Sequence, residues 1–398
     1  MNETSQTKSK SAWMAFTLGE WLFCLSVISM FLPIKVYPAV FLIAAAYFLW
    51  ETKKLLTEKW ALALAVFGLY ALISFWIHFS GQTFELTNII KLAVNFIFLY
   101  AAVLWMHHRD NRRLLQLLDY TFILIFILVA LQLWVYHQAM GYRLVGGSTS
   151  SGQASILYNK SLFFWGLDDK NMFGARIALL GFIFILLPVV LLKRVSLVRV
   201  ILVFALAFLS LSRTPIVALL IGVGLLFWMV SGRWLRIFLV AVILGVTPYV
   251  MQKVIRIDNI TASNDGMGVR MVYWKAFFEN FDHISPLGNG FLSAPEFLSA
   301  HADFFHGEPH IHNTFLSTYL ELGIIGFSAY LLFLVFFIRF CYHKHPEPCF
   351  WLLTLTPLLA IMMILYSGYD NDLILYLILV FGLGTVRPAA LNENKIRL

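Results

Sequence analysis

Long apolar stretches run through most of the chain, and they limit what it can fold into. Of its 398 residues, 60% are hydrophobic and 13% are charged. A run of about 20 apolar residues crosses a bilayer as a helix, because a helix pairs its own backbone groups. The sequence therefore predicts an all-α polytopic membrane protein in which 1–398 form a single integral membrane domain. We place about twelve transmembrane helices near 13–34, 36–50, 60–79, 88–106, 114–137, 172–192, 196–212, 214–231, 236–254, 313–338, 349–366 and 372–386.

The distribution of lysine and arginine predicts how these helices are oriented. Short cytoplasmic loops carry an excess of both residues. If the N-terminus is cytoplasmic, most of the 29 lysines and arginines lie on the cytoplasmic side. Most of the others lie in two longer external loops, where the rule has little force. The predicted topology is therefore N-in and C-in, and the net charge of +8 reflects that topology and does not indicate a nucleic-acid partner.

Two predicted periplasmic segments are too long to be simple turns. The first is 138–171, and the second, 255–311, lies directly before the third-last span. Loops held on a rigid scaffold commonly carry binding and catalytic residues. Within the second loop, 268–281 is predicted to form an aromatic-rich helix that lies in the membrane interface.

Two arginines at the outer side have no role in topology. Arg213 lies in a tight turn between two spans. It either extends to lipid headgroups or faces an anionic ligand, and the short turn favours the ligand because it leaves little freedom to extend. Arg176 lies one turn inside its span, and there the two interpretations have equal support.

A third arginine lies in the predicted interfacial helix. Arg270 and Trp274 are one turn apart on one face of this helix. In one interpretation Arg270 contacts lipid phosphate at the membrane surface. In the other it forms a phosphate clamp with Arg213, because guanidinium groups bind phosphate oxygens in a bidentate manner. The sequence supports the two equally.

The second loop ends in His310-Ile311-His312-Asn313, at the mouth of the span 313–338. Neutral imidazole accepts a proton from a hydroxyl group near pH 7, so His312 is a candidate general base. Glu321 lies inside the same span, where a carboxyl group is costly unless it faces protein or water. Gly323 and Gly326 leave one turn without bulk, which predicts the close approach of another helix.

The histidines of this region do not predict a metal site. They lack the spacing of a helical ligand pair, and no carboxylates recur beside them. The residues concerned are His301, His306, His310 and His312.

These motifs together resemble the signature of the O-antigen ligase and polymerase superfamily, and most of all the lipopolysaccharide O-antigen ligases. The likeness covers roughly 200–330 by motif and the whole chain by topology. It rests on elements in a fixed order along the chain. These are Ser212-Arg213 between two spans, then Arg270, Trp274, Pro286, Gly288 and Gly290, then His312-Asn313, and finally Gly323-x-x-Gly326.

The resemblance implies a metal-independent, inverting glycosyltransferase with a GT-C-like architecture. It would lie in the bacterial inner membrane with its active site facing the periplasm. Its donor would be a glycan on undecaprenyl diphosphate, its acceptor a sugar hydroxyl of lipid A–core among the membrane lipids, and no cofactor is implied. His312 would activate the hydroxyl, and Arg213 and Arg270 would bind the diphosphate. Supporting or possible positions are Asn313, Glu321, Gly323, Gly326, Trp274, Arg176 and His310.

A polymerase of the same superfamily is the main alternative, because it shares the donor chemistry. Some polymerases carry arginine-x10-glycine motifs in two external loops. Here non-glycine residues stand at the glycine position, since Arg143, Arg256 and Arg270 are followed by Ala154, Met267 and Phe281. This difference favours a ligase. A protein O-oligosaccharyltransferase, which usually has an extracytoplasmic domain after its spans, and a transporter, which usually has internal repeats, are less favoured.

Overall fold

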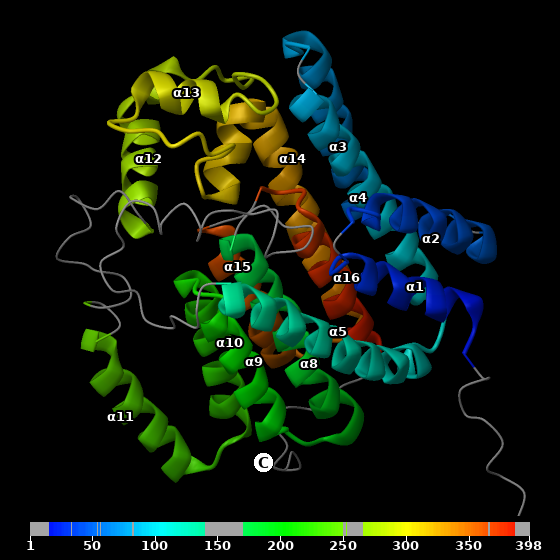
Figure 1. Cartoon of the computed structure of the whole chain (residues 1–398). Helices are drawn as coiled ribbons and strands as arrows, with labels where there is room; N and C mark the ends of the chain where they lie inside the picture. The colour runs from blue at the N-terminus through cyan, green and yellow to red at the C-terminus, as the bar shows by residue number, and fades with distance from the viewer. Residues whose placement is uncertain are drawn as a thin grey trace, which may run out of the picture.

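The computed structural model is built from helices. It describes residues 16–386 apart from 33, 54, 56, 82, 140–169, 250, 251, 253–265, 365 and 366. In this part of the chain every regular element is a helix (Figure 1). In order these are α1 (Leu18–Ser29), α2 (Tyr37–Thr52), α3 (Lys59–His78), α4 (Thr83–His107), α5 (Arg112–Ala139), α8 (Lys170–Leu192), α9 (Leu197–Leu209), α10 (Arg213–Val230), α11 (Arg233–Tyr249), α12 (Met267–Glu279), the 3-10 turn η4 (Phe281–His283), α13 (Ala294–His301), α14 (Thr314–Lys344), α15 (Pro348–Met362) and α16 (Asn371–Thr385).

Each of the predicted apolar stretches contains a helix, and this confirms the all-α, membrane-embedded class. Within the described residues, five helices are long and apolar enough to cross a membrane, namely α3, α4, α5, α8 and α14. Six more are apolar but shorter, from 10 to 17 residues. The number of membrane crossings, the orientation and the GT-C-like architecture stay predictions.

The centre of the bundle is formed by α8 and α16. Both are apolar on all sides, and nearly every side chain of each is buried. A helix with this composition has to be enclosed by others. Accordingly α8 packs against α5, α9, α10 and α16, and α16 packs also against α4, α14 and α15.

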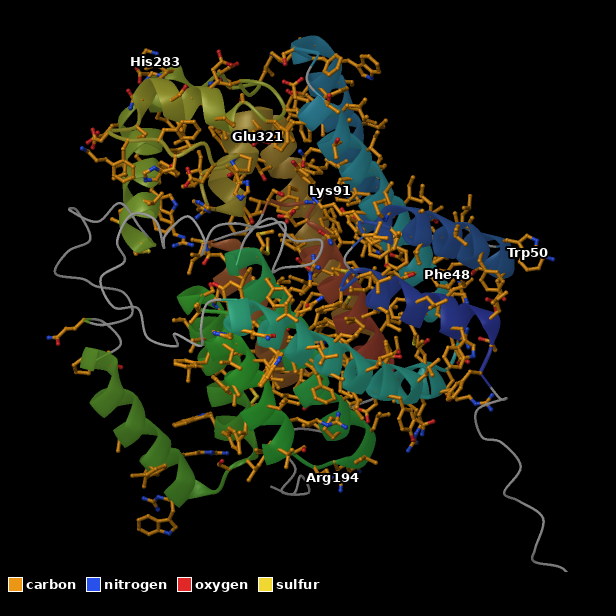
Figure 2. The ribbon with its side chains drawn as sticks, in the orientation of Figure 1. Phe48, Trp50, Lys91, Arg194, His283 and Glu321 are labelled. Carbon is orange, nitrogen blue, oxygen red and sulfur yellow. The ribbon has the colours of Figure 1, made fainter. Side chains whose placement is uncertain are left out.

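The outside of the bundle is apolar, as lipid contact requires. On α2, Trp50 is 69% exposed whereas Phe48 is fully buried. Figure 2 shows Trp50 extending away from the helices and Phe48 between them. Large exposed apolar side chains recur on α3 and α5, and a surface of this kind in a soluble protein would be an aggregation site.

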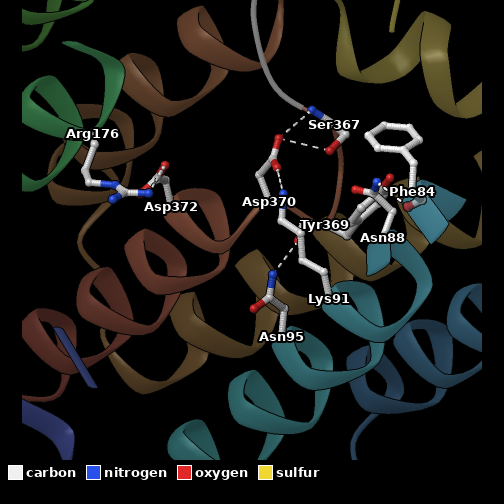
Figure 3. A network of polar contacts seen from close by, with 9 residues as sticks. All are labelled: Phe84, Asn88, Lys91, Asn95, Arg176, Ser367, Tyr369, Asp370 and Asp372. Atoms are coloured by element: carbon white, nitrogen blue, oxygen red, sulfur yellow. Dashed lines mark hydrogen bonds and ion pairs between the residues drawn. The ribbon is translucent and has the colours of Figure 1, made fainter. Parts of the chain in front are cut away.

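Charged side chains inside the bundle occur as ion pairs. Arg176 of α8 donates through Nε to Asp372 Oδ1 at 2.6 Å and through Nη2 to Oδ2 at 3.3 Å, and its Nη1 bonds to the carbonyl of Met30. Lys91 of α4 pairs with Asp370, which also accepts hydrogen bonds from Ser367 (Figure 3). A buried charge in a membrane protein is tolerated when it is paired in this way.

The ion pair with Asp372 excludes one of the two interpretations of Arg176, namely contact with lipid headgroups. Its side chain is only 4% exposed, so it does not extend to the headgroups. It joins the first turns of α8 and α16, and its carboxylate partner lies 196 positions away in the sequence.

Several helix ends meet at one end of the bundle. A Cβ at Gly174 of α8 would lie 2.7 Å from Pro215 of α10, so these two helices start together. Arg176 and Asp372 join the starts of α8 and α16 in the same way. The start of α15 lies beside the end of α16, because a Cβ at Gly384 would lie 3.0 Å from Trp351. Since α15 runs antiparallel to α16, the end of α15 lies near the starts of α8, α10 and α16.

A smaller layer covers this end. It consists of α12, α13 and the first turns of α14, and it has a core of its own that includes Tyr273, Phe277, Leu298, Ile311 and Leu320. Figure 1 shows α12 and α13 beside the start of α14, at the end of the molecule that α3 also reaches. In Figure 2, His283 of this layer and Arg194 of the α8–α9 connection lie at opposite ends of the molecule. This arrangement agrees with the predicted placement of the two segments on opposite sides of the membrane.

Candidate functional site

The helix that follows the histidine motif is broken at Gly323. This residue has φ 58° and ψ −160°, which are not helical values. The part from 324 to 344 is helical and roughly 30 Å long at 1.5 Å per residue, about the thickness of a hydrocarbon core. The part from 314 to 322 belongs to the covering layer.

A backbone turn docks into the break. The turn at 286–290 makes three backbone hydrogen bonds with α14. Ile324 N donates to Pro286 O at 2.9 Å, Asn289 N to Leu320 O at 2.8 Å, and Gly290 N to Glu321 O at 3.1 Å. The turn therefore satisfies backbone groups that the broken helix leaves unpaired.

Two glycines make this docking possible. A Cβ at Gly323 would lie 2.2 Å from Pro286 O, and a Cβ at Gly288 would lie 2.4 Å from Glu321 O. At Gly323 the approaching segment is the backbone of 286–288 and not a second helix. A Cβ at Gly326 would meet the side chain of Leu322 in the same helix, at 2.2 Å.

Glu321 is buried beside this turn. Its side chain accepts a hydrogen bond from the backbone N–H of Leu292, and its backbone oxygen accepts one from Gly290. The carboxyl group thus faces protein, which is the condition for a carboxyl group at this depth. These contacts attach the covering layer to α14.

His312 is held in place by both of its neighbours. The N–H of Ile311, whose side chain is fully buried, donates to Ser317 Oγ at 3.2 Å. Asn313 is the N-cap of α14, since its Oδ1 accepts from the N–H groups of Phe315 (2.9 Å) and Leu316 (3.1 Å). Asn313 Nδ2 also donates to Met363 O at 3.3 Å, which joins the histidine segment to the end of α15.

His312 itself has an unfavourable backbone conformation. Its φ is 58°, in the left-handed region that costs a non-glycine residue roughly 1–2 kcal/mol. The fixed residues on either side impose this conformation. A side chain retained at such a position, where glycine would be less strained, is typical of a functional site.

The imidazole of His312 lies among groups from α12 and the adjacent loop. Its ring is parallel to that of Tyr273, with centroids 6.1 Å apart and an interplanar angle of 2°. The ring of His310 lies edge-on at 5.4 Å. The Nδ1 atom of His312 is buried and has no hydrogen-bond partner among the described residues.

These surroundings favour the neutral imidazole. Burial lowers the pKa of His312 well below its usual range, and the nearby charges of His310 and Arg270 lower the pKa further. A neutral ring has an acceptor nitrogen. The group can therefore accept a proton near pH 7.

Arg270 lies on the buried face of α12 and is 7% exposed. Its Nε donates to Ile364 O at 2.9 Å, just beyond the end of α15. Asn313 bonds to Met363 in the same short segment. Residues 363–364 therefore hold Arg270 and the histidine motif together, although the two are far apart in the sequence. Trp274, one turn after Arg270, is half-buried, and its indole N–H is also without a described partner.

Tyr273 also lies in this site, although no motif in the sequence singled it out. Its side chain is fully buried, and its hydroxyl contacts the Glu308 carboxylate and accepts a hydrogen bond from the N–H of His306 at 3.3 Å. Burial and the bond to Glu308 raise the pKa of Tyr273, so it stays protonated. The signal available in the sequence was its position three residues after Arg270, which places both on one helical face.

The second predicted arginine is described only through its backbone. Arg213 begins α10, and its side chain lies outside the described residues. The preceding Ser212 is buried and donates to Asn171 Oδ1 at 2.9 Å, which fixes the start of α10 against the start of α8. The start of α10, and with it Arg213, therefore lies at the same end of the bundle as Met363 and Ile364. Its pairing with Arg270 stays a prediction.

The first predicted loop, 138–171, lies almost entirely outside the described residues. The other histidines are placed in the covering layer. His301 stacks near His283 at 5.0 Å, and His306 lies near Phe304 at 5.2 Å. In the part of the chain that the structure describes, no three His, Cys, Asp or Glu side chains gather as metal ligands would.

One comparison with known proteins supports a family. Residues 198–331 match the O-antigen ligase family model. The match runs from α9 into α14 and includes Arg213, Arg270, His312, Gly323 and Gly326. It supports membership of the O-antigen ligase family, as the motifs predicted, and with it a multi-pass membrane enzyme of the glycosyltransferase type. No curated protein matches the chain.

Proposed function

We propose that this protein is an O-antigen ligase. It transfers a glycan from undecaprenyl diphosphate to a sugar hydroxyl of lipid A–core, at the periplasmic face of the bacterial inner membrane. The observation that carries this proposal is the neutral, partly unsatisfied His312, held beside Arg270 and Tyr273 within the region that matches the family.

The reaction requires one base and a site for negative charge. A neutral His312 accepts the proton of the acceptor hydroxyl while that oxygen attacks the anomeric carbon. The bond from this carbon to the donor phosphate breaks, and its electron pair remains on the diphosphate. Preorganised cations stabilise this charge as it develops, and Arg270 and Arg213 fill that role. The diphosphate leaves as a stable anion, so no acid is needed on that side.

Donor binding also prepares the base. Without substrate, the charge of Arg270 contributes to the low pKa of His312. A diphosphate bound at Arg270 compensates this charge and places negative charge near the imidazole, which raises the pKa of His312. The histidine therefore becomes a stronger base once the donor is present.

This coupling predicts two different pH profiles. The profile of kcat/KM follows the free enzyme, and that of kcat follows the enzyme–substrate complex. We expect kcat/KM to stay level as the pH falls through 6.5, the ordinary histidine value, and to decline only below it. The decline in kcat is expected at higher pH than the decline in kcat/KM. Profiles measured with purified enzyme and lipid-linked donor test this, and coincident profiles with a decline near pH 6.5 or above would contradict the coupling.

The arginine clamp predicts a graded loss of donor binding and turnover when Arg270 or Arg213 is substituted. Arg270→Ala is expected to weaken donor binding and to lower turnover by about 100-fold, as the loss of a charge-stabilising donor does elsewhere. Arg270→Lys should restore only part of the activity, because lysine lacks the planar fork. Arg213→Ala should behave in the same way.

Lys275→Ala is the matched control for this series. Lys275 lies in the same helix but is more than half exposed, and it pairs with Asp303 at 3.3 Å. We expect its turnover to remain near that of the wild type. Donor affinity is measured by titration with undecaprenyl diphosphate-linked glycan. Equal losses in Lys275→Ala and Arg270→Ala would indicate a general surface-charge effect and not a clamp.

A polymerase would use the same donor, so the acceptor distinguishes the two functions. A ligase needs an opening toward the lipid wide enough for lipid A–core, and Phe278 on the outer face of α12 is 64% exposed and suited to contact with acyl chains. A second undecaprenyl-linked substrate would need further phosphate-binding cations. Within the described residues, the additional candidate Arg176 is already bonded to Asp372.

The phenotype of a deletion strain tests the choice. A strain without the ligase makes lipopolysaccharide that ends at the core, and long glycan accumulates on undecaprenyl diphosphate. A strain without the polymerase attaches a single repeat unit to the core. Gel analysis of lipopolysaccharide separates these outcomes, and the single-unit pattern would replace the ligase proposal with the polymerase.

A further inference from the structure

A cavity lies at the opposite end of α14 from His312. It has a volume of about 300 Å³ and is formed by the start of α3 and the last turns of α14. The two helices are antiparallel, since Trp60 at the start of α3 lies 5.9 Å from Phe340 and Phe67 lies 5.2 Å from Tyr330. The cavity is separated from the break at Gly323 by the membrane-length part of α14.

The lining combines an apolar wall with a cationic rim. The wall is formed by Trp60, Phe336 and Phe340. The rim carries three exposed cations, Lys59, Arg339 and Lys344, against one carboxylate, Glu58, and His343 bonds to Arg339 at 3.3 Å. The local charge is therefore positive, and the cavity is suited to an anion with an apolar part.

A buried donor in the lining also lacks a partner. Trp60 is fully buried, and its indole Nε1 has no hydrogen bond to any described residue. Buried polar groups are nearly always paired, so an unpaired one needs an explanation. A ligand oxygen in the cavity would supply the missing acceptor.

We propose that this cavity binds the phosphate headgroup of an anionic phospholipid. The phosphate contacts Lys59, Arg339 and Lys344, and the Trp60 N–H donates to a headgroup oxygen. The acyl chains continue along exposed apolar side chains of both helices, including Leu62 (68% exposed) and Val335 (57% exposed). Basic pockets between transmembrane helices bind anionic headgroups in this manner. The lipid belongs to the leaflet farther from His312, so the site is distinct from the donor site.

Charge variants test the site without reference to glycan transfer. The protein is reconstituted in nanodiscs made of equal parts phosphatidylglycerol and phosphatidylcholine, and the lipids that stay bound after extraction are counted by native mass spectrometry. We expect the wild type to retain phosphatidylglycerol selectively. The double variant Arg339→Gln/Lys344→Gln should lose about tenfold in this preference, because each cation near the headgroup strengthens anionic-lipid binding.

The matched control is Arg112→Gln/Arg113→Gln. It removes the same charge from exposed positions at the start of α5. These positions lie at the same end of the molecule as the cavity, because His107, at the end of the preceding helix α4, lies 5.3 Å from Phe340. This control should retain phosphatidylglycerol as the wild type does. Trp60→Phe keeps the ring and removes the donor, and it should show a smaller loss than the charge variant. The thermal unfolding temperature of each variant is measured as well. If it is unchanged, a loss of lipid binding does not come from a loss of fold.

Three results would overturn the proposal. The first is equal loss in the two charge variants, which would indicate nonspecific attraction to the basic surface. The second is unchanged retention in Arg339→Gln/Lys344→Gln. The third is displacement of the retained lipid by inorganic phosphate or glycerol 1-phosphate, which would identify the site as one for small soluble anions.

Discussion

His312→Ala is expected to abolish glycan transfer and leave the protein folded in the membrane. In the proposed mechanism the imidazole accepts the hydroxyl proton, and loss of a general base lowers rates by about 10²–10⁴. The backbone around it is fixed by the Ser317 bond of Ile311 and by the Asn313 cap, neither of which involves the histidine side chain. The thermal unfolding temperature should therefore change little.

His312→Gly adds a second measurement to this prediction. Glycine adopts a φ of 58° without strain, so this variant should be inactive and yet unfold at the same temperature as the wild type or above it. Loss of activity without loss of stability would not be expected if His312 only contributed to packing.

His301→Ala and His306→Ala are the controls. Both residues lie in the same covering layer, but their rings contact Phe297 and Phe304 and not His312. They should keep most of the activity in a purified transfer assay. Retention of activity by His312→Ala would rule out the general-base role. A chelator should have no effect on the wild type, and a loss that zinc reverses would instead indicate a metal enzyme.

Gly323→Ala is expected to have the largest effect on the fold. The added Cβ would lie 2.2 Å from Pro286 O, and alanine at φ 58° is strained whatever space is available. The turn must move away from α14, which breaks the bond from Ile324 N to Pro286 O. We expect a loss of about 3 kcal/mol or more in stability, together with loss of transfer, because the covering layer carries Arg270 and Tyr273.

Gly224→Ala is the matched control for this change. Gly224 lies within α10, and no atom lies within 4 Å of a Cβ placed there. Alanine is favoured over glycine inside a helix by about 1 kcal/mol, so this variant should be as stable as the wild type or more so. Thermal unfolding and amide hydrogen exchange at Asn289, Gly290 and Ile324 measure the difference. Equal behaviour of the two variants would show that the docked turn does not hold the layer.

The sequence was sufficient to predict the class of fold and to propose residues for the candidate site. Apolar periodicity located the helices, because membrane helices need long uninterrupted apolar runs. The motifs located Arg270 and His312, which the structure brings together. Gly323 was misassigned, because glycine suits both a helix–helix contact and a positive φ, and only the partner backbone at 286–288 decides between them.

Long-range pairing was the other missing information. The role of Arg176 depends on Asp372, and that of Arg270 depends in part on Ile364, which lies 94 positions away. A single sequence does not reveal which distant helices become neighbours. Tyr273 was overlooked for the same reason, since its aromatic neighbours suggested lipid contact and not the histidine that stacks on it.

The turn at 286–290 is bonded to α14 through backbone groups, and this has a consequence for how its sequence can vary. Three bonds between the turn at 286–290 and α14 involve no side chains, so the attachment tolerates replacement of residues such as the exposed Leu287. The side chains at the exposed positions of this turn can therefore change while His312 keeps its place. Substitution of Leu287 could alter the outer surface of the turn and leave its docking onto α14 intact.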